Sequence, residues 1–259
     1  MHIRLLGRMA VETADGRPVR TRGQHGRALF TLLATAGRPR SREGIAADLW
    51  PDDLIGTGSP LRHALYQLRG GLVSAGLDPD AILETDADTL GLRPTAVLDL
   101  DVVAFDRASR PPMPDPELAV RLYGGDFAEG LPHDCFALER DRLADRFEDA
   151  LAAVADRRLG AGDLDAARDA AERLLARDPL REEAHAVLLT IHGLTGSRAQ
   201  VVRQYRRVRD VLARELGEPP LPETDAAYRR AMARVVARSQ VRAAELAGQD
   251  APHLVAVGS

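Results

Sequence analysis

The sequence predicts a mainly α-helical fold, with an α+β unit at the N-terminus and an all-α unit of paired helices after it. The 259 residues are 45% hydrophobic but only 4% aromatic, so the core must consist mainly of Leu, Val and Ala. Such a composition favours helices. Short extended runs occur only within residues 1–100, whereas nearly every stretch from Glu117 to Ala243 has a helical pattern.

The first elements expected along the chain are two short strands, over residues 3–11 and 17–20, on either side of the turn Asp15-Gly16. A helix is expected from about His25 to Ala36, since its apolar residues share one face. A second, short helix is expected from Arg42 to Leu49, with a Ser before it that can cap its first turn.

A third helix is expected to start at Ser59-Pro60, because Ser is a good N-cap and Pro suits the first helical position. Its apolar residues form one stripe at steps of four, three and four: Leu61, Leu65, Leu68 and Leu72. Two extended runs around Asp86-Ala87-Asp88 then predict a hairpin. The order strand, strand, helix, helix, helix, hairpin is that of a winged helix-turn-helix.

In such a unit the third helix is the natural DNA reader, because a helix fits the major groove and can offer Arg to guanine or Gln to adenine. Considered alone, the helix would more often be an ordinary amphipathic helix with a solvated polar face, because an amphipathic stripe is common. The surrounding elements favour DNA recognition. The residues expected to contact bases are Arg62, His63, Tyr66, Gln67 and Arg69, and those expected at phosphates are Arg42, Ser59 and Arg93.

The charge distribution supports this reading in one segment and opposes it in the next. The chain contains no Lys, as in GC-rich actinobacterial coding, and its net charge is −4. Residues 1–75 hold 11 Arg and six acids, whereas residues 76–107 hold two Arg and eight acids. The acidic hairpin tip would repel phosphates. The pair Gly70-Gly71 should weaken the third helix by about 1 kcal/mol per Gly. We therefore expect modest DNA affinity, or binding by two protomers.

The helical part contains an internal repeat. Turns at Gly162 and Gly196 are 34 residues apart, which is the period of tetratricopeptide repeats, and Asp178-Pro179 ends the first unit. The expected organisation is a winged helix over residues 1–97, a tetratricopeptide-like helical domain over 98–245, and a disordered tail over 246–259. The Arg-rich stretch from Arg198 to Arg214 is either a solvated helix face or a partner-binding surface.

The remaining residues do not predict catalysis. His133, Asp134 and Cys135 are adjacent in sequence, whereas a nucleophile, its base and its orienting group must converge in space, so Cys135 is interpreted as a buried thiol. No His spacing suits a metal, and we expect no enzyme activity and no cofactor. No apolar run could span a membrane, and Arg4 and Arg8 interrupt the N-terminal segment, so a cytoplasmic location is expected.

Four stretches resemble a known family. They are Leu5-Leu6-Gly7 with Asp15-Gly16-Arg17-Pro18; Ser41 to Pro51 with Leu61 to Arg69; Leu100 to Phe105 with Leu122 to Phe127 and Gly130-Leu131-Pro132; and Asp178 to His185 with Gln204 to Arg207 and Glu215 to Thr224. With these motifs the sequence resembles the Streptomyces antibiotic regulatory proteins, a family of transcriptional activators. The resemblance extends from about residue 3 to about residue 235.

The resemblance implies an OmpR-like winged helix followed by a bacterial transcriptional activation domain. Such proteins bind direct repeats in promoters as side-by-side protomers, here a homodimer on double-stranded DNA, and recruit RNA polymerase holoenzyme, commonly to clusters for secondary metabolites. The sequence has no Gly-x-x-x-x-Gly-Lys-Ser/Thr loop and would be a short member. The alternative is a tetratricopeptide-like protein-interaction adaptor with a degenerate winged helix.

Overall fold

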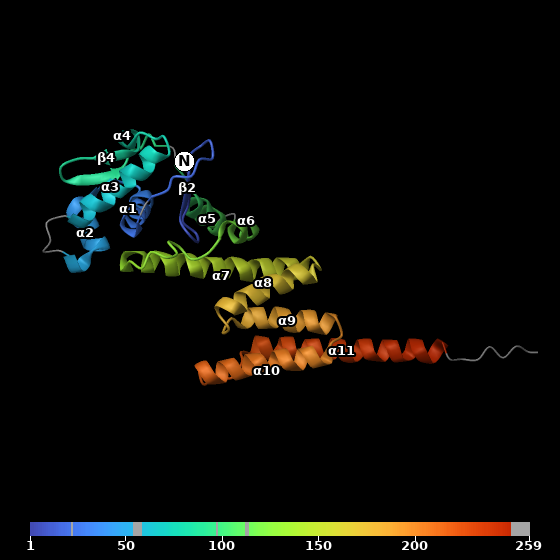
Figure 1. Cartoon of the computed structure of the whole chain (residues 1–259). Coiled ribbons are helices and arrows are strands. Elements are labelled where there is room, and N and C mark those ends of the chain that lie inside the picture. The colour runs from blue at the N-terminus through green and yellow to red at the C-terminus, as the bar shows by residue number, and fades with distance from the viewer. Residues whose placement is uncertain (22, 54–58, 97, 112–113, 250–259) are drawn as a thin grey trace, which may run out of the picture. The chain divides into compact units, whose positions relative to one another are not determined.

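The computed structural model describes residues 1–259 except residues 22, 54–58, 97, 112–113 and 250–259 (Figure 1). The chain forms two compact units, Met1–Ala150 (unit 1) and Leu151–Ser259 (unit 2). The boundary between these units lies within a long helix, α7 (Ala137–Gly160), and the domain boundary expected after residue 97 stays a prediction. No helix in the described part of the chain is both long and apolar enough to cross a membrane.

Unit 1 begins with a three-stranded sheet of order β2-β1-β6. The strand β1 (His2–Arg4) pairs antiparallel with β2 (Ala10–Glu12) and parallel with β6 (Asp99–Leu100). The expected continuous strand over residues 3–11 is wrong, because Gly7 has a φ of 99° and breaks the extended backbone. The strand expected over residues 17–20 is reduced to one bridge between Pro18 and Glu12.

The carboxylate of Asp101, directly after the parallel strand β6, binds the backbone where β1 ends. The backbone N–H groups of Leu5 and Leu6 donate to Asp101, at 2.8 and 3.0 Å, directly before the break at Gly7. Burial raises the pKa of Asp101 and these hydrogen bonds oppose that shift. Asp101 therefore satisfies two donors that the interrupted strand leaves without ladder partners.

Three helices follow, close to their predicted bounds: α1 (Gln24–Ala36), α2 (Arg42–Leu49) and α3 (Ser59–Ser74), with a 3-10 turn, η1 (Pro51–Asp53), after α2. The Ser41 hydroxyl accepts the Gly44 N–H at 3.1 Å, which confirms the predicted cap of α2. Helices α1 and α3, the blue and cyan ribbons in Figure 1, pack against each other, and the apolar residues of both are buried.

The predicted hairpin is confirmed, with β4 (Leu83–Thr85) antiparallel to β5 (Thr89–Leu92) after the short helix α4 (Pro79–Ile82). A strand that was not predicted, β3 (Arg40–Ser41), completes the sheet in the order β3-β5-β4. This close pairing requires Gly91, since a Cβ there would lie 2.8 Å from the Pro39 Cα. Three helices and this sheet form a winged helix.

The rest of unit 1 contains α5 (Asp101–Ser109), α6 (Pro116–Leu122), a 3-10 turn, η2 (Asp134–Phe136), and the first part of α7. The rings of Tyr123 and Phe147 stack with centroids 4.1 Å apart, and this links the end of α6 to α7. Arg142 and Arg146 of α7 both bind the Asp106 carboxylate of α5. Residues 112–113, part of the expected Pro-rich loop, lie outside the described residues.

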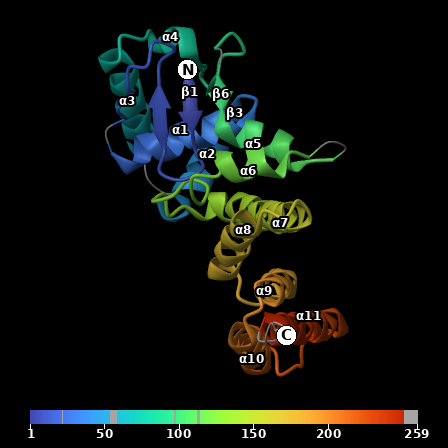
Figure 2. The ribbon, with the colours of Figure 1, turned by 90° about the vertical axis from the view of Figure 1, so that its right-hand side faces the viewer.

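Unit 2 continues with α8 (Leu164–Arg177), α9 (Glu182–Leu194), α10 (Arg198–Glu215) and α11 (Pro222–Gln249). Helix α9 packs against α8, α10 and α11 (Figure 2). Gly162 and Gly196 both have a φ of 78° at turns between helices, which confirms the predicted 34-residue repeat. Residues 246–249 are helical, and residues 250–259 of the expected tail lie outside the described residues.

Two close contacts hold α10 and α11 against α9. Gly193 of α9 lies so near α11 that a Cβ there would be 2.7 Å from the Ala231 Cα. His185 of α9 is buried, its Nε2–H donates to the Pro179 carbonyl at 3.0 Å, and its Nδ1 accepts the Gln204 amide of α10 at 2.7 Å. Burial lowers the pKa of His185 and keeps its ring neutral.

Candidate nucleic-acid interface

Helix α3 has one buried and one exposed face, as its sequence predicts. Leu61, Leu68 and Leu72 are buried, while Leu65 is only half-buried and Ala64 fills the stripe beside it. On the opposite face lie the predicted base-contacting residues Arg62, His63 and Tyr66, and the Tyr66 side chain is 76% exposed. A soluble protein exposes so large an aromatic surface at recognition sites more often than elsewhere.

The exposed face of α3 borders a shallow depression of about 400 Å³. Its lining comprises Arg20, His63, Tyr66, Gln67, Gly70, Gly71 and Ser74. Arg20 precedes α1 by sequence and was not among the predicted site residues, because nothing local marks its approach to α3. Its segment packs tightly against Gly71: a Cβ there would be 3.1 Å from both the Arg20 carbonyl oxygen and the Thr21 Cα, so a larger residue would require that segment to shift.

The two neighbouring glycines of α3 therefore differ in role. Gly71 makes room for the segment before α1, whereas a Cβ at Gly70 would have no atom within 4 Å. The helix continues through both residues to Ser74. Packing against residues 20–21 thus compensates for the low helix propensity that the sequence predicts at this point.

Gln67 is held within the protein and does not extend toward solvent. Its Oε1 accepts the backbone N–H of Gly26 in the first turn of α1 at 3.0 Å, and its amide donates to His63 Nε2 at 2.7 Å. A Cβ at Gly23 would lie 2.5 Å from the Gln67 amide. Gln67 therefore ties α3 to the start of α1 and orients His63, whose ring is exposed beside it.

Three of the predicted DNA-contacting arginines bind groups of the winged helix itself. Arg69 forms an ion pair with Asp80 at 2.7 Å, and Arg93 donates to the Asp80 carbonyl at 2.7 Å. Arg42 donates to the Asp86 carbonyl at the hairpin tip at 3.1 Å. The side chain of Ser59, the first residue of α3, lies outside the described residues.

The hairpin tip is docked on the start of α2, with its carboxylates exposed. The Arg42 N–H donates to the Asp88 carbonyl at 2.9 Å, and the Asp86 N–H donates to Thr89 at 3.0 Å. These bonds fix the turn, but Asp86 and Asp88 both remain exposed to solvent. The predicted acidic wing tip is therefore present as a rigid feature.

A second depression, of about 400 Å³, lies beside Trp50 and His133. Trp50 is half-buried and its indole N–H donates to His25 Nδ1 at 2.9 Å. Burial raises the pKa of Cys135 to about 11, and the thiol is protonated at neutral pH. Among the described residues, no three His, Cys, Asp or Glu side chains form a possible metal site.

The comparisons place this architecture among known proteins. Residues 114–231 match the family described as "Bacterial transcriptional activator domain". The sequence has no match among curated proteins. One similar solved structure is Mycobacterium tuberculosis EmbR in complex with a low affinity phosphopeptide, at a TM-score of 0.67 and 23% identity, covering 96% of this chain and 70% of that one. At this identity the likeness shows the fold.

The domain match and the fold agree with the resemblance found in the sequence motifs. The activator domain covers the stretch in which the most specific of those motifs lie, and the winged helix precedes it. The chain therefore contains a bacterial transcriptional activator domain preceded by a winged helix, which is the arrangement that the resemblance to the Streptomyces antibiotic regulatory proteins implies.

Proposed function

We propose that the protein binds specific promoter sequences through the winged helix and activates transcription there. The observation that carries this proposal is the exposed face of α3, where Arg62, His63 and Tyr66 lie side by side on a helix whose other face is buried. A helix presented in this way by a winged helix can enter the major groove. Arg62 offers the bidentate donor that suits a guanine, and Tyr66 offers apolar contact to a thymine methyl group.

The remaining site residues have supporting roles in this proposal. Gln67 positions His63 and the start of α1, because both of its amide atoms are already bonded there. Arg20 lies at the rim of the same depression and joins Arg42, Arg69, Arg93 and the start of α3 at Ser59 as a phosphate contact. Arg42, Arg69 and Arg93 would each have to share or exchange a protein partner to reach a phosphate.

Activation would follow from two protomers bound side by side on direct repeats, with the helical domain, proposed to span residues 98–245, contacting RNA polymerase. The target genes would belong to a secondary-metabolite cluster, in a cytoplasmic setting. This part of the proposal is supported by the match of residues 114–231 to the bacterial transcriptional activator domain and by the resemblance in the sequence motifs.

A second candidate function, a protein-interaction adaptor, is favoured by one observation. The exposed carboxylates of the rigid hairpin tip and the protein-bonded state of Arg42, Arg69 and Arg93 all reduce attraction to phosphates. Binding to duplex DNA separates the two functions, because neutralised phosphates release counterions and make the affinity fall steeply with salt.

The test is to incubate the purified protein with sheared genomic DNA and to sequence the bound fragments at two salt concentrations. Enrichment of upstream regions that share a direct repeat, weaker at the higher salt, supports the proposal. On an enriched fragment, Arg62→Ala should cost about 1–3 kcal/mol of binding free energy if Arg62 reads a guanine. Folded protein that enriches no fragment at either salt would exclude the proposal in favour of the adaptor function.

A further inference from the structure

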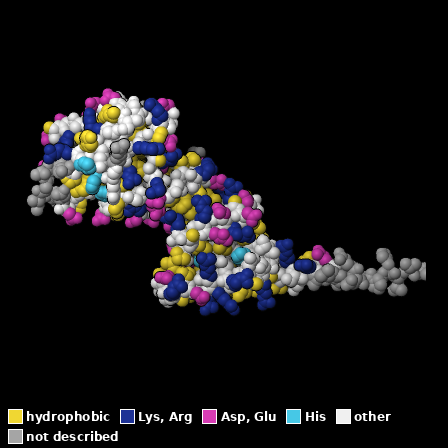
Figure 3. Space-filling view, viewed as in Figure 1, with side chains coloured by type: hydrophobic (Ala, Val, Ile, Leu, Met, Phe, Trp, Pro, Cys, Tyr) yellow, Lys and Arg dark blue, Asp and Glu magenta, His cyan; other side chains and the backbone are white. Residues whose placement is uncertain are grey.

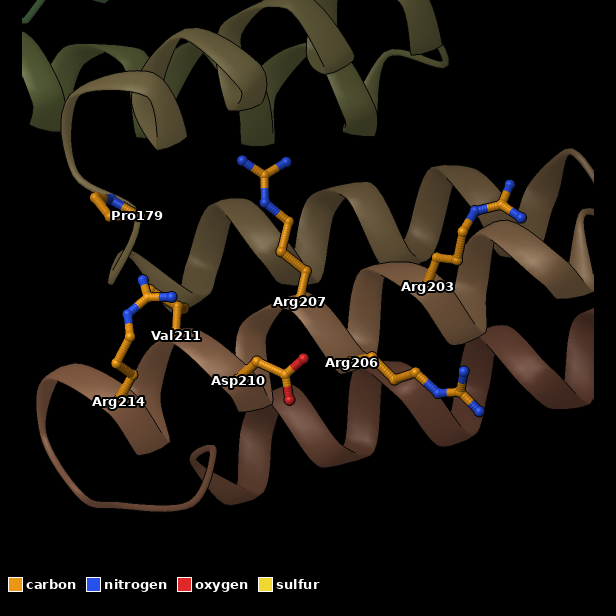
Figure 4. A pocket seen from close by; sticks show the side chains of 7 residues that line it. All are labelled: Pro179, Arg203, Arg206, Arg207, Asp210, Val211 and Arg214. Carbon is orange, nitrogen blue, oxygen red and sulfur yellow. The ribbon is translucent and has the colours of Figure 1, made fainter.

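Unit 2 contains a concave basic surface that the proposed DNA interface does not use. A depression of about 530 Å³ lies along α10 beside the loop between α8 and α9. We name it the α10 groove, and its lining consists of Pro179, Arg203, Arg206, Arg207, Asp210, Val211 and Arg214 (Figure 4). Figure 4 shows Arg203, Arg207 and Arg214 extending from α10 toward the same side.

The groove follows from the spacing of residues on α10. The face of α10 that packs in the core carries Val201, Gln204 and Val208, all buried. The groove face is displaced from it by about a third of a helix turn, and its four arginines are all exposed. Val211 at the boundary is buried and gives the groove an apolar floor.

The arginines of the groove are poorly neutralised by the protein. Within the described part of the chain, no ion pair joins Arg203, Arg206 or Arg207 to a carboxylate, and Arg214 pairs only with the adjacent Glu215. Arg203 and Arg207 stand four residues apart on one helix, where like charges destabilise the helix. The stability of the fold therefore does not explain why these like charges lie side by side. Arrangements that cost stability in this way are expected at binding surfaces.

The excess of positive charge continues beyond the groove. Residues 198–242, which form most of α10 and α11, contain 11 Arg and five acidic residues, although the whole chain has a net charge of −4. Figure 3 shows basic side chains gathered over this part of unit 2. A partner that docks here gains from the opposite charge, both in encounter rate and in the bound state.

We propose that the α10 groove binds an acidic peptide segment of a partner protein, with carboxylates on the arginines and an apolar side chain on Val211 and Pro179. The apolar part of the lining favours a peptide over duplex DNA, because a peptide side chain can pack on Val211 and Pro179 whereas a phosphate backbone offers no apolar group there. Guanidinium groups bind carboxylates in a bidentate manner, and their aliphatic stems extend the apolar floor. Asp210 on the rim repels a negative charge placed directly opposite it. A peptide can leave that position uncharged between its carboxylates, whereas a nucleic-acid strand carries a phosphate at every nucleotide.

The test measures binding of the full chain to a short fluorescein-labelled peptide of Glu, Leu and Ser by fluorescence anisotropy at physiological ionic strength. The twin peptide with Gln in place of every Glu is the ligand control. The variant Arg203→Gln/Arg207→Gln/Arg214→Gln removes three groove cations. The matched variant Arg229→Gln/Arg230→Gln/Arg234→Gln removes the same charge from exposed positions of α11 that do not line the groove.

The wild type should bind the Glu peptide and not its Gln twin. The groove variant should bind the Glu peptide at least about tenfold more weakly, because each charge-assisted hydrogen bond lost has a large effect. The α11 variant should stay within about twofold of the wild type. Thermal melting of both variants controls for folding, and an Arg62→Ala variant that keeps peptide affinity separates this result from the DNA-binding proposal.

Three results would overturn the proposal. The first is an equal loss in both triple variants, which would indicate non-specific attraction. The second is unchanged peptide binding by the groove variant. The third is a groove variant that loses affinity for random duplex DNA but not for the Glu peptide, which would identify the groove as a phosphate-binding surface instead.

Discussion

Helices α3 and α10 both expose arginines, but they differ in how the protein treats those charges. In unit 1, Arg69 of α3 is paired with Asp80, and Arg42 and Arg93, from other elements of the winged helix, are bonded to backbone carbonyls. In unit 2, Arg203 and Arg207 have no carboxylate partner among the described residues. The comparison teaches that a basic helix face in the sequence does not reveal where free positive charge lies in the fold.

Each of these two helices carries a Gln that donates to a His at 2.7 Å, but the two hydrogen bonds lie in opposite surroundings. Gln67 donates to His63 on an exposed surface, whereas Gln204 donates to the buried ring of His185 between α9 and α10. Burial lowers the pKa of His185. An identical pair of residue types therefore orients a surface group in one unit and satisfies the core in the other.

The largest expected effect on stability comes from replacing Gln204, and the matched change at Gln67 serves as its comparison. Gln204→Ala leaves a buried His185 nitrogen without a donor and opens a cavity, and should lower the free energy of unfolding by about 2–4 kcal/mol. Gln67→Ala removes a partly exposed bond to Gly26 and should cost only about 1 kcal/mol. Urea unfolding of both variants measures the difference, and equal losses would contradict the contrast drawn between the two pairs.

A smaller effect is expected from matched Gly→Ala changes in helices of the two units. Gly193→Ala places a Cβ 2.7 Å from the Ala231 Cα and should cost about 1–3 kcal/mol through overpacking between α9 and α11. Gly70→Ala adds a Cβ with no atom within 4 Å and should stabilise the protein by about 0.5–1 kcal/mol. Thermal melting would reveal the opposite signs. A stabilising Gly193→Ala would show that the helices can move apart freely.

The pH dependence of the free energy of unfolding tests the burial of His185. The pKa of His185 is lowered from 6.5 in the folded protein, so the unfolded chain binds more protons between that lowered pKa and 6.5. The free energy of unfolding should therefore fall as the pH drops below about 6.5, by no more than about 1.4 kcal/mol per pH unit for this one group. His185→Gln should reduce the slope, and an unchanged slope would assign it to other groups, such as His133 and His192, whose pKa values burial also lowers.

The smallest effect is expected at the exposed ion pair of α3. Arg69→Gln should change the free energy of unfolding by less than about 1 kcal/mol, because solvent screens the pair with Asp80. Its effect on DNA binding should be a uniform loss across sequences, since a phosphate contact carries no base preference. Competition binding with specific and random duplexes checks this, and a loss confined to the specific duplex would give Arg69 a role at a base.

The sequence predicted most of the features that depend on neighbouring residues. The cap at Ser41, the apolar stripe of α3, the hairpin and the turns at Gly162 and Gly196 all follow from local chemistry. It did not predict features set by distant partners. The N–H that Gln67 binds is at Gly26, 41 residues earlier, and the two-residue strand β3 exists only because β5 lies beside it.

Predictions about side-chain roles were limited by the same cause. Helical spacing correctly placed Arg62, His63 and Tyr66 on one exposed face. Spacing cannot tell which long polar side chain bends back to the protein, because that depends on where acceptors such as Asp80 lie in space. Arg20 was not predicted as a site residue, because it approaches α3 from a segment that has no sequence pattern of its own.

The bond between Asp101 and the backbone of residues 5 and 6 bears on how the N-terminal unit is made. During synthesis β1 emerges early, but its parallel partner β6 and the Asp101 carboxylate leave the ribosome only about a hundred residues later. Until then one edge of the sheet remains open to other strands. A fragment ended at residue 97 would keep that edge exposed permanently, so expression of the winged helix alone should extend at least through α5.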